Sequence, residues 1–179
     1  MDSIILVDLN DKEIGHCSKC DAHSSGKLHR AFSIFIYSGS KMLLQKRAAH
    51  KYHSGGLWAN ACCSHPRLGE LLETALHRRL QDELGIDCKV EKLFDFIYFQ
   101  KYSDNMFEYE FDHVYAGSYR GSISSNPDEI EEIRWVEFAD LKKELLESPE
   151  KFAAWFLIAA PRVIGMLESS NKRQNGPEK

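Results

Sequence analysis

The chain has 179 residues and a formal net charge of −4, and 43% of its residues are hydrophobic. This length suits one domain with a packed core and excludes a chain that is disordered throughout. Positive and negative residues are mixed along the sequence, so it has no cluster of basic residues of the kind that binds nucleic acid.

The sequence favours neither a membrane span nor a disulfide framework. Its most apolar stretch, residues 152–160, has about half of the roughly 20 residues that cross a bilayer. The acidic start lacks the basic residues and long apolar run of a signal peptide. The five cysteines are odd in number and do not form a disulfide pattern. We therefore expect a cytoplasmic protein with reduced thiols and, since no extensive apolar seam is evident, a monomer.

The first third of the chain predicts strands. The run at residues 3–9 predicts a strand that turns back at residues 10–12. Residues 31–37 are aromatic and β-branched, and with a turn at residues 38–41 and the run at 42–46 they predict a hairpin.

A loop and a helix follow this hairpin. Residues 48–58 favour a loop that carries function, because they contain two glycines and the polar aromatic residues His50, Tyr52 and His53. Residues 70–84 form the clearest predicted helix, since leucines recur at four-residue steps while charged residues occupy other faces. Gly85 is the expected C-cap.

The rest of the chain alternates strands and helices. We predict strands at about residues 92–102, 107–119 and 132–136, and helices at 138–146 and 149–167. Pro161 should bend the last helix, and the polar residues 169–179 should form a disordered tail. This order predicts one α+β domain over residues 1–168, with an antiparallel-rich mixed sheet.

The predicted helix carries a spaced pattern of charged residues. Ser64 is followed after five residues by Glu70, and after seven more by residues 78–86. This pattern resembles the Nudix box, a strand-loop-helix that presents carboxylates to a metal on a diphosphate. Arg79 and Asp82 replace glutamates of the box, and the arginine would weaken metal binding but add a diphosphate ligand. The alternative is an ordinary amphipathic helix with ion pairs four residues apart.

Side chains that commonly ligate metals occur at three places in the sequence. The first place has His23 and His29, the second has His65, and the third has Glu108 and Glu110. Alternation along a strand puts Glu108 and Glu110 on one face, roughly 6.5–7 Å apart. Two such carboxylates repel each other unless a cation or a proton lies between them. Tyr109 and Phe111 would then face the core. The alternative for this Glu-X-Glu segment is an exposed acidic stripe.

The cysteines permit two further interpretations. Residues 16–23 contain two cysteines and two histidines that could form a zinc knuckle, although the ligand spacing is too short for one. Cys63 lies two positions from His65 on an extended segment and so shares its side of the chain. Such a thiol can do proton or nucleophile chemistry if a nearby cation lowers its pKa. Alternatively it is a buried small hydrophobe, as we expect for Cys62.

Together these segments resemble type I isopentenyl diphosphate isomerases over about residues 3–160. The matching segments occur in the family's order and spacing, at residues 27–33, 43–48, 60–66 and 108–112. The resemblance implies a Nudix-type mixed sheet sandwiched by helices, with an added N-terminal hairpin. It also implies an enzyme of isoprenoid biosynthesis that interconverts isopentenyl and dimethylallyl diphosphate. Such an enzyme protonates the alkene and removes a proton on the opposite face.

The resemblance assigns roles to individual residues. One divalent metal (manganese, magnesium or zinc) would be bound by His23, His29, His65, Glu108 and Glu110. The reacting carbons would lie between Glu110, assisted by Tyr98 as proton donor, and a thiolate at Cys63 as acceptor. The diphosphate would be bound by Lys19, Arg47, Lys51 and Arg79. A magnesium ion on the diphosphate would be held by Glu83, and the indole of Trp155 would lie near the tertiary carbocation.

Two other functions remain open from the sequence. An ordinary Nudix hydrolase would share the fold but cleave the diphosphate anhydride, and Arg79 in place of a helix carboxylate speaks against it. A non-catalytic binding module stabilised by metal would have no activity for Cys63 to affect. The isomerase chemistry needs the residue types assigned above, because protonating an unactivated alkene requires a strong, well-placed acid in a dry pocket.

Overall fold

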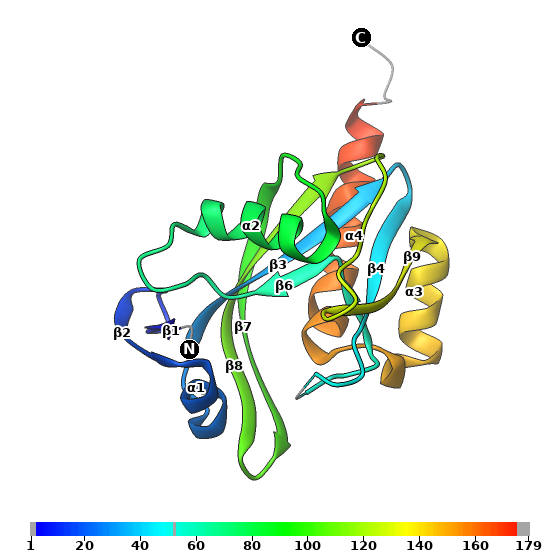
Figure 1. The fold of residues 1–179 in the computed structure, drawn as a ribbon. Helices are drawn as coiled ribbons and strands as arrows, with labels where there is room; N and C mark the ends of the chain where they lie inside the picture. Colours follow the sequence, from blue (N-terminus) through cyan, green and yellow to red (C-terminus); the bar gives the residue numbers. More distant parts are fainter. Residues whose placement is uncertain (1–2, 52, 175–179) are drawn as a thin grey trace.

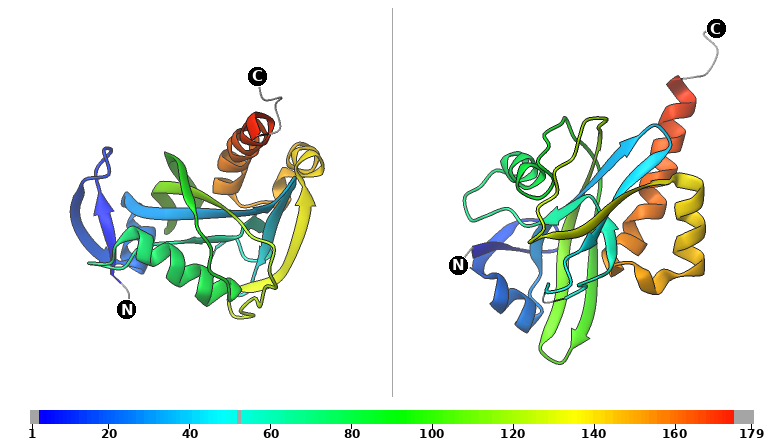
Figure 2. Two further views of the ribbon diagram at one scale, coloured as in Figure 1. Left: turned by 90° about the horizontal axis from the view of Figure 1, so that it is seen from above. Right: turned by 45° about the vertical axis from the view of Figure 1, so that its right-hand side comes forward.

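The computed structural model describes residues 3–51 and 53–174, and within them a mixed sheet has helices on both faces (Figures 1 and 2). Its strands are β1 (Ser3–Val7), β2 (Glu13–Ser18), β3 (His29–Ser38), β4 (Lys41–Arg47), β5 (Trp58–Asn60), β6 (Cys62–Ser64), β7 (Glu91–Ser103), β8 (Met106–Ser118) and β9 (Ile130–Glu137). Its helices are α1 (Lys19–Ser25), α2 (Leu72–Leu84), α3 (Phe138–Glu147) and α4 (Ala154–Gln174), with a short 3-10 helix at Pro149–Lys151.

The strand β3 organises the sheet. One path of neighbours runs β2-β1-β3-β4-β5, while β6 and β8 also pair with β3, β7 pairs with β8 and β9 pairs with β4. The pairing of β3 with β8 is parallel and sets His29 beside Glu110, so the register itself brings two predicted ligands together.

Both faces of the sheet are buried, which explains the apolar runs of β3 and β4. On one face, Phe32, Ile34 and Ile36 pack in a core with the leucines of α2. On the other face, Phe35 stacks on Phe156 of α4, with ring centroids 5.8 Å apart. Figure 2 shows α2 on one side of the strands and α3 and α4 on the other.

The N-terminal hairpin is present as predicted, since β1 and β2 pair antiparallel around the turn at residues 10–12. The helix α1 that follows was not predicted. The Ser18 side chain caps its start by accepting the N–H of Asp21 at 3.1 Å, and Gly26 ends it in the left-handed region at φ 60°. This helix carries Lys19 and His23 toward β8.

The long hairpin of β7 and β8 corrects one prediction. Alternation does put Glu108 and Glu110 on one face, but these carboxylates are the buried ones, with 3% and 7% exposure. Tyr109 and Phe111 lie on the opposite face and are half-buried, so the prediction that they face the core was wrong. The exposed acidic stripe is excluded as well. Histidines from other elements make the burial of the two glutamates possible.

The helices α2 and α3 match their predictions, whereas the helix predicted over residues 149–167 is divided into the 3-10 helix at Pro149–Lys151 and α4, which starts at Ala154. Gly85 caps α2 in the left-handed region at φ 64°. The last helix continues to Gln174, beyond the predicted end at residue 167, and Pro161 lies within it. The predicted tail thus overlaps this helix, while residues 175–179 and the loop residue 52 lie outside the described part. None of the helices described is long and apolar enough to cross a membrane.

Candidate active site

Four side chains from separate segments meet beside the β3–β8 pair. His23 comes from α1, His29 from β3, His65 from the segment after β6 and Glu110 from β8. One ligand atom of each lies within 4.8 Å of the others. The Nε2 atoms of His29 and His65 are 3.2 Å apart, and His65 Nε2 lies 2.9 Å from Glu110 Oε1.

The chemistry of this cluster fits a divalent metal. His29 Nδ1 is 2.8 Å from the carbonyl of Lys27, and donating to it leaves the Nε2 lone pair facing the cluster. Burial lowers the pKa of His23 to about 2 and that of His65 to about 3, so both rings are neutral. Neutral imidazoles with a carboxylate are ligands that divalent metals prefer. His29 Nε2, His65 Nε2 and Glu110 Oε1 lie within 3.5 Å of one another, which is close enough for the three atoms to share one cation.

Glu108 belongs to a second group that overlaps the first. Its partners are His23 and His53, and their ligand atoms also lie within 4.8 Å of one another. His53 Nε2 is 2.8 Å from Glu108 Oε1. The five predicted metal ligands therefore fall in two groups that share His23. His53 is an additional candidate, and its place in the glycine-containing loop was its one signal in the sequence.

Tyr98 connects the two carboxylates. The β7–β8 register sets it opposite Glu110, and its hydroxyl lies 2.7 Å from Glu110 Oε2 and 2.9 Å from Glu108 Oε2. Burial and the neighbouring carboxylates raise the pKa of Tyr98 well above its ordinary value. The phenol therefore stays protonated and can donate to a carboxylate.

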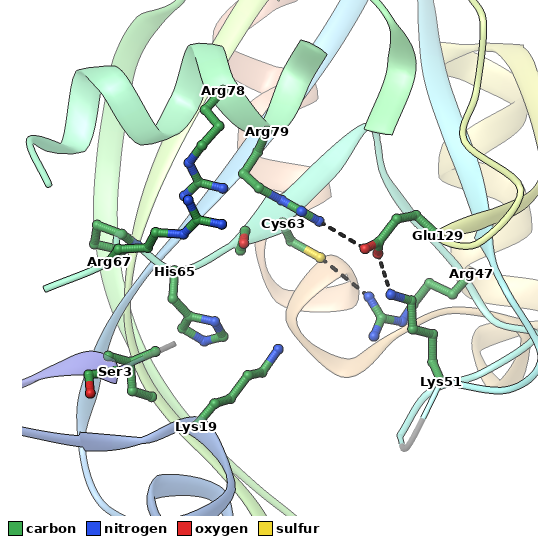
Figure 3. Close-up of a pocket in the computed structure, with 13 residues that line it drawn as sticks. Ser3, Lys19, Arg47, Lys51, Cys63, His65, Arg67, Arg78, Arg79 and Glu129 are labelled. Atoms are coloured by element: carbon green, nitrogen blue, oxygen red, sulfur yellow. Dashed lines mark hydrogen bonds and ion pairs between the residues drawn. The ribbon is translucent and has the colours of Figure 1, made fainter. Parts of the chain in front are cut away.

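Cys63 and Glu110 line one small cavity, which we call the inner cavity; its lining also includes Tyr98 and Trp155. The short strand β6 places Cys63 there by pairing it with Ser33 of β3. An Arg47 N–H donates to the thiol sulfur at 3.6 Å (Figure 3). Burial nevertheless raises the pKa of Cys63 to about 12, so the sulfur carries its proton.

Beside the inner cavity lies a larger opening of about 190 Å³, the cationic cleft (Figure 3). All four predicted diphosphate ligands line it, and two further arginines do too: Lys19, Arg47, Lys51, Arg67, Arg78 and Arg79. The two openings share Lys19, Arg47 and Cys63. One elongated molecule could thus place an anionic end among the cations and its other end between Cys63 and Glu110.

Two carboxylates flank Arg79 at this cleft. Arg79 contacts Glu83 four residues later on α2, and its Nη2 lies 3.4 Å from Glu129 Oε1. Glu129 also contacts Lys51 (Figure 3). The ion pair expected of an ordinary amphipathic helix is therefore present; its arginine lines the cleft, whereas Glu83 is buried and does not. Glu129 precedes β9 without any motif and was missed from the sequence.

The zinc knuckle is not supported. Residues 19–25 of that segment form α1, and the possible metal-ligand groups within the described residues include neither Cys17 nor Cys20. Cys62 is fully buried, as expected of a small hydrophobe.

Comparison with known proteins defines the class of this fold. The NUDIX domain family matches residues 27–156, so the chain belongs to the NUDIX domain proteins. The crystal structure of DR0079 from Deinococcus radiodurans is similar with a TM-score of 0.75 and 18% identity, covering 90% of this chain and 98% of that one. A MutT NUDIX hydrolase from Burkholderia pseudomallei gives a TM-score of 0.60 at 20% identity, over 74% of this chain and 95% of its own. These structures confirm the predicted fold.

Closer relatives narrow the class. Isopentenyl-diphosphate Delta-isomerase 1 of Aromatoleum aromaticum is 48% identical over 96% of this chain and 98% of its own length. Isopentenyl-diphosphate Delta-isomerase 2 of Photorhabdus laumondii subsp. laumondii is 48% identical over 87% of this chain and 89% of its own. The chain belongs to the isopentenyl-diphosphate Delta-isomerase family, which confirms the resemblance predicted from its sequence.

Proposed function

We propose that this chain interconverts isopentenyl diphosphate and dimethylallyl diphosphate, the reaction named in its relatives. One observation carries the proposal: Cys63 and Glu110 line the same inner cavity, which adjoins a cleft of cationic side chains. A five-carbon chain placed between these two residues can receive a proton from one and lose another to the second.

The diphosphate end is proposed to bind in the cationic cleft, with Lys19, Arg47, Lys51 and Arg79 as its ligands. Guanidinium groups bind phosphate oxygens through paired N–H donors, and the lysines add point charges. Because this binding energy is remote from the reacting carbons, it can hold them in position for proton transfer. Ionic anchoring and proton chemistry are thus assigned to adjoining but different regions.

The proton transfers are proposed to use Cys63 and Glu110. Adding a proton to the terminal alkene carbon gives a tertiary carbocation, and removing a proton from the neighbouring carbon forms the new double bond. Since the reaction is reversible, the donor in one direction is the acceptor in the other. Tyr98 orients the Glu110 carboxyl through its hydrogen bond, and the Trp155 indole stabilises the cation.

The same proposal includes two divalent ions. The His/Glu groups would hold manganese, magnesium or zinc through His23, His29, His65, Glu108 and Glu110. Glu83 would hold magnesium that accompanies the diphosphate. When bound, such an ion acts as a Lewis acid, strengthening the acid it contacts or neutralising phosphate charge.

Incubation with isopentenyl diphosphate and magnesium, followed by NMR, tests the proposal. We expect dimethylallyl diphosphate to appear without release of phosphate, and Cys63→Ala to abolish its formation. Cys88→Ala is the matched control, because Cys88 lies away from both openings and should leave turnover intact. Phosphate release without the isomeric product would instead identify a NUDIX hydrolase.

We further propose that the protein acts as a monomer and that residues 1–168 form its functional domain. Action in the cytoplasm belongs to the same proposal. Size-exclusion chromatography with light scattering, and activity of a chain ending at residue 168, test the monomer and the domain; imaging of a tagged chain tests the location.

A further inference from the structure

Trp155 lines the inner cavity, and its indole N–H is bonded to a buried side chain. Its indole N–H donates to Asn60 Oδ1 at 3.0 Å, and both residues are buried. Asn60 ends β5, whereas Trp155 lies at the start of α4, so this bond joins the sheet to a helix. The ring also lies edge-on to His53 and 5.3 Å from the Arg47 guanidinium.

The orientation of the Asn60 amide is determined by its other contacts. Its nitrogen donates to the carbonyl of Ile34 at 3.2 Å and to that of Cys62 at 2.6 Å. These two bonds use both N–H groups of the amide. The oxygen must therefore point toward Trp155, and an amide rotated by 180° would set its oxygen against two carbonyl oxygens.

The bond to Cys62 gives this arrangement a consequence for the reaction. Cys62 precedes Cys63 on β6. The Asn60 amide therefore fixes both the backbone beside the thiol and the orientation of the indole ring. We propose that Asn60 is a positioning residue that sets the indole face of Trp155 relative to the Cys63 sulfur. This inference rests on the proposed function, in which a carbocation forms between these groups.

A cation is attracted to the face of an aromatic ring and not to its edge, so the interaction depends on ring orientation. Without the Asn60 acceptor, the buried indole N–H would lose its partner and the ring would turn to find another. The anchoring of the diphosphate should change much less, because Asn60 and Trp155 are absent from the lining of the cationic cleft and Arg47, which contacts the indole, is one of six cations there.

The test combines kinetics and binding for the wild type, Asn60→Leu, Trp155→Phe and the double variant. We expect Asn60→Leu to lower kcat about tenfold or more with KM within twofold. Calorimetry should show a similar loss of affinity for a diphosphate ester that carries a tertiary ammonium in place of the carbocation. Affinity for inorganic pyrophosphate should remain within twofold.

The double variant separates positioning from general damage. Phenylalanine keeps a ring but has no N–H to be held, so Asn60→Leu should lower kcat by a smaller factor in Trp155→Phe than in the wild type, because only the bonds to the Ile34 and Cys62 carbonyls are then left to lose. The proposal would be overturned if the two substitutions lowered kcat multiplicatively in the double variant. It would also be overturned if Asn60→Leu lowered the affinities for pyrophosphate and for the ammonium ester equally. If Asn60→Leu does not fold, Asn60→Ser, which is too short to reach the indole, replaces it. A wild type without isomerase activity would refute the proposed function, while the two binding measurements would still decide the role of Asn60.

Discussion

Replacing Tyr98 with phenylalanine removes one oxygen atom from the centre of the proposed site. That oxygen lies 2.7 Å from Glu110 and 2.9 Å from Glu108, and the residue is 5% exposed. A single phenol proton can be donated to only one carboxylate at a time. The shorter contact identifies Glu110 as its main acceptor, so the variant should disturb the carboxyl that takes part in proton transfer.

The size of the effect follows from the kind of bond. A hydrogen bond to a charged group contributes roughly 1.5–3 kcal/mol. Loss of that amount from the transition state lowers kcat by roughly 10- to 150-fold. We expect KM to change little, because Tyr98 does not line the cationic cleft where the diphosphate is proposed to bind. The aromatic ring remains, so the packing around it should persist.

The assay is a steady-state isomerase measurement together with metal content and melting temperature. Tyr102→Phe is the matched control: its hydroxyl is 3.4 Å from Glu108, is not hydrogen-bonded to Glu110 and accepts from Ser54. A contact that long contributes little, so this variant should lose about threefold or less. If Tyr98→Phe were no slower than Tyr102→Phe at equal metal content, the proposed orientation of Glu110 by Tyr98 would be refuted.

Three further predictions concern stability. A strong chelator should lower the melting temperature in scanning fluorimetry, because metal binds the folded state; an unchanged melting temperature would contradict a metal site. In urea titrations, the chelated protein should lose stability from pH 7 to pH 5, since unfolded histidines titrate near 6.5 but His23 and His65 have folded pKa values of about 2 and 3. Because these two histidines gain protons in that range only when the chain is unfolded, the free energy of unfolding should fall by on the order of 2 kcal/mol per histidine. A free energy of unfolding that does not change between pH 7 and pH 5 would contradict this prediction. Gly85→Ala should cost about 1–2 kcal/mol in urea unfolding with activity retained, because alanine is strained at φ 64° and its Cβ would meet Ser124 O at 3.1 Å; wild-type stability would count against this.

Long, regular patterns made much of the fold predictable. The leucines of α2 recur on its buried face, and the glycine after it supplies the left-handed cap. The strands β7 and β8 were likewise predicted, from two runs rich in apolar and aromatic residues. In both cases the local conformational preference of the segment agrees with its tertiary packing. Such a segment can be predicted without knowing which other segments it packs against.

The helix α1 escaped prediction because its evidence is short. It has seven residues, too few to show an apolar period, and its cysteines and histidine suggest a metal knuckle instead. Ser18, Asp21 and Gly26 were available as start and stop signals. Reading them as caps would have placed Lys19 and His23 on one short helix.

The side of β8 that faces inward could not be obtained from alternation. A period of two separates Glu108 and Glu110 from Tyr109 and Phe111, but it does not say which pair is buried. The usual preference for burying aromatic residues gave the wrong answer. Burial of the carboxylates depends on histidines that are distant in sequence, which only the folded chain brings beside them.

The distribution of carboxylates also explains how a NUDIX fold can favour isomerisation over hydrolysis. On α2, Glu83 is buried against Arg79, while the Asp82 side chain is 48% exposed and 3.7 Å from Arg78. The helix therefore offers the cationic cleft little of the clustered negative charge that gathers metals and a nucleophilic water on an anhydride. Glu108 and Glu110 instead line the inner cavity and are absent from the lining of the cleft. A diphosphate bound among the cations would thus lie apart from these acids, whereas the hydrocarbon attached to it would lie beside them.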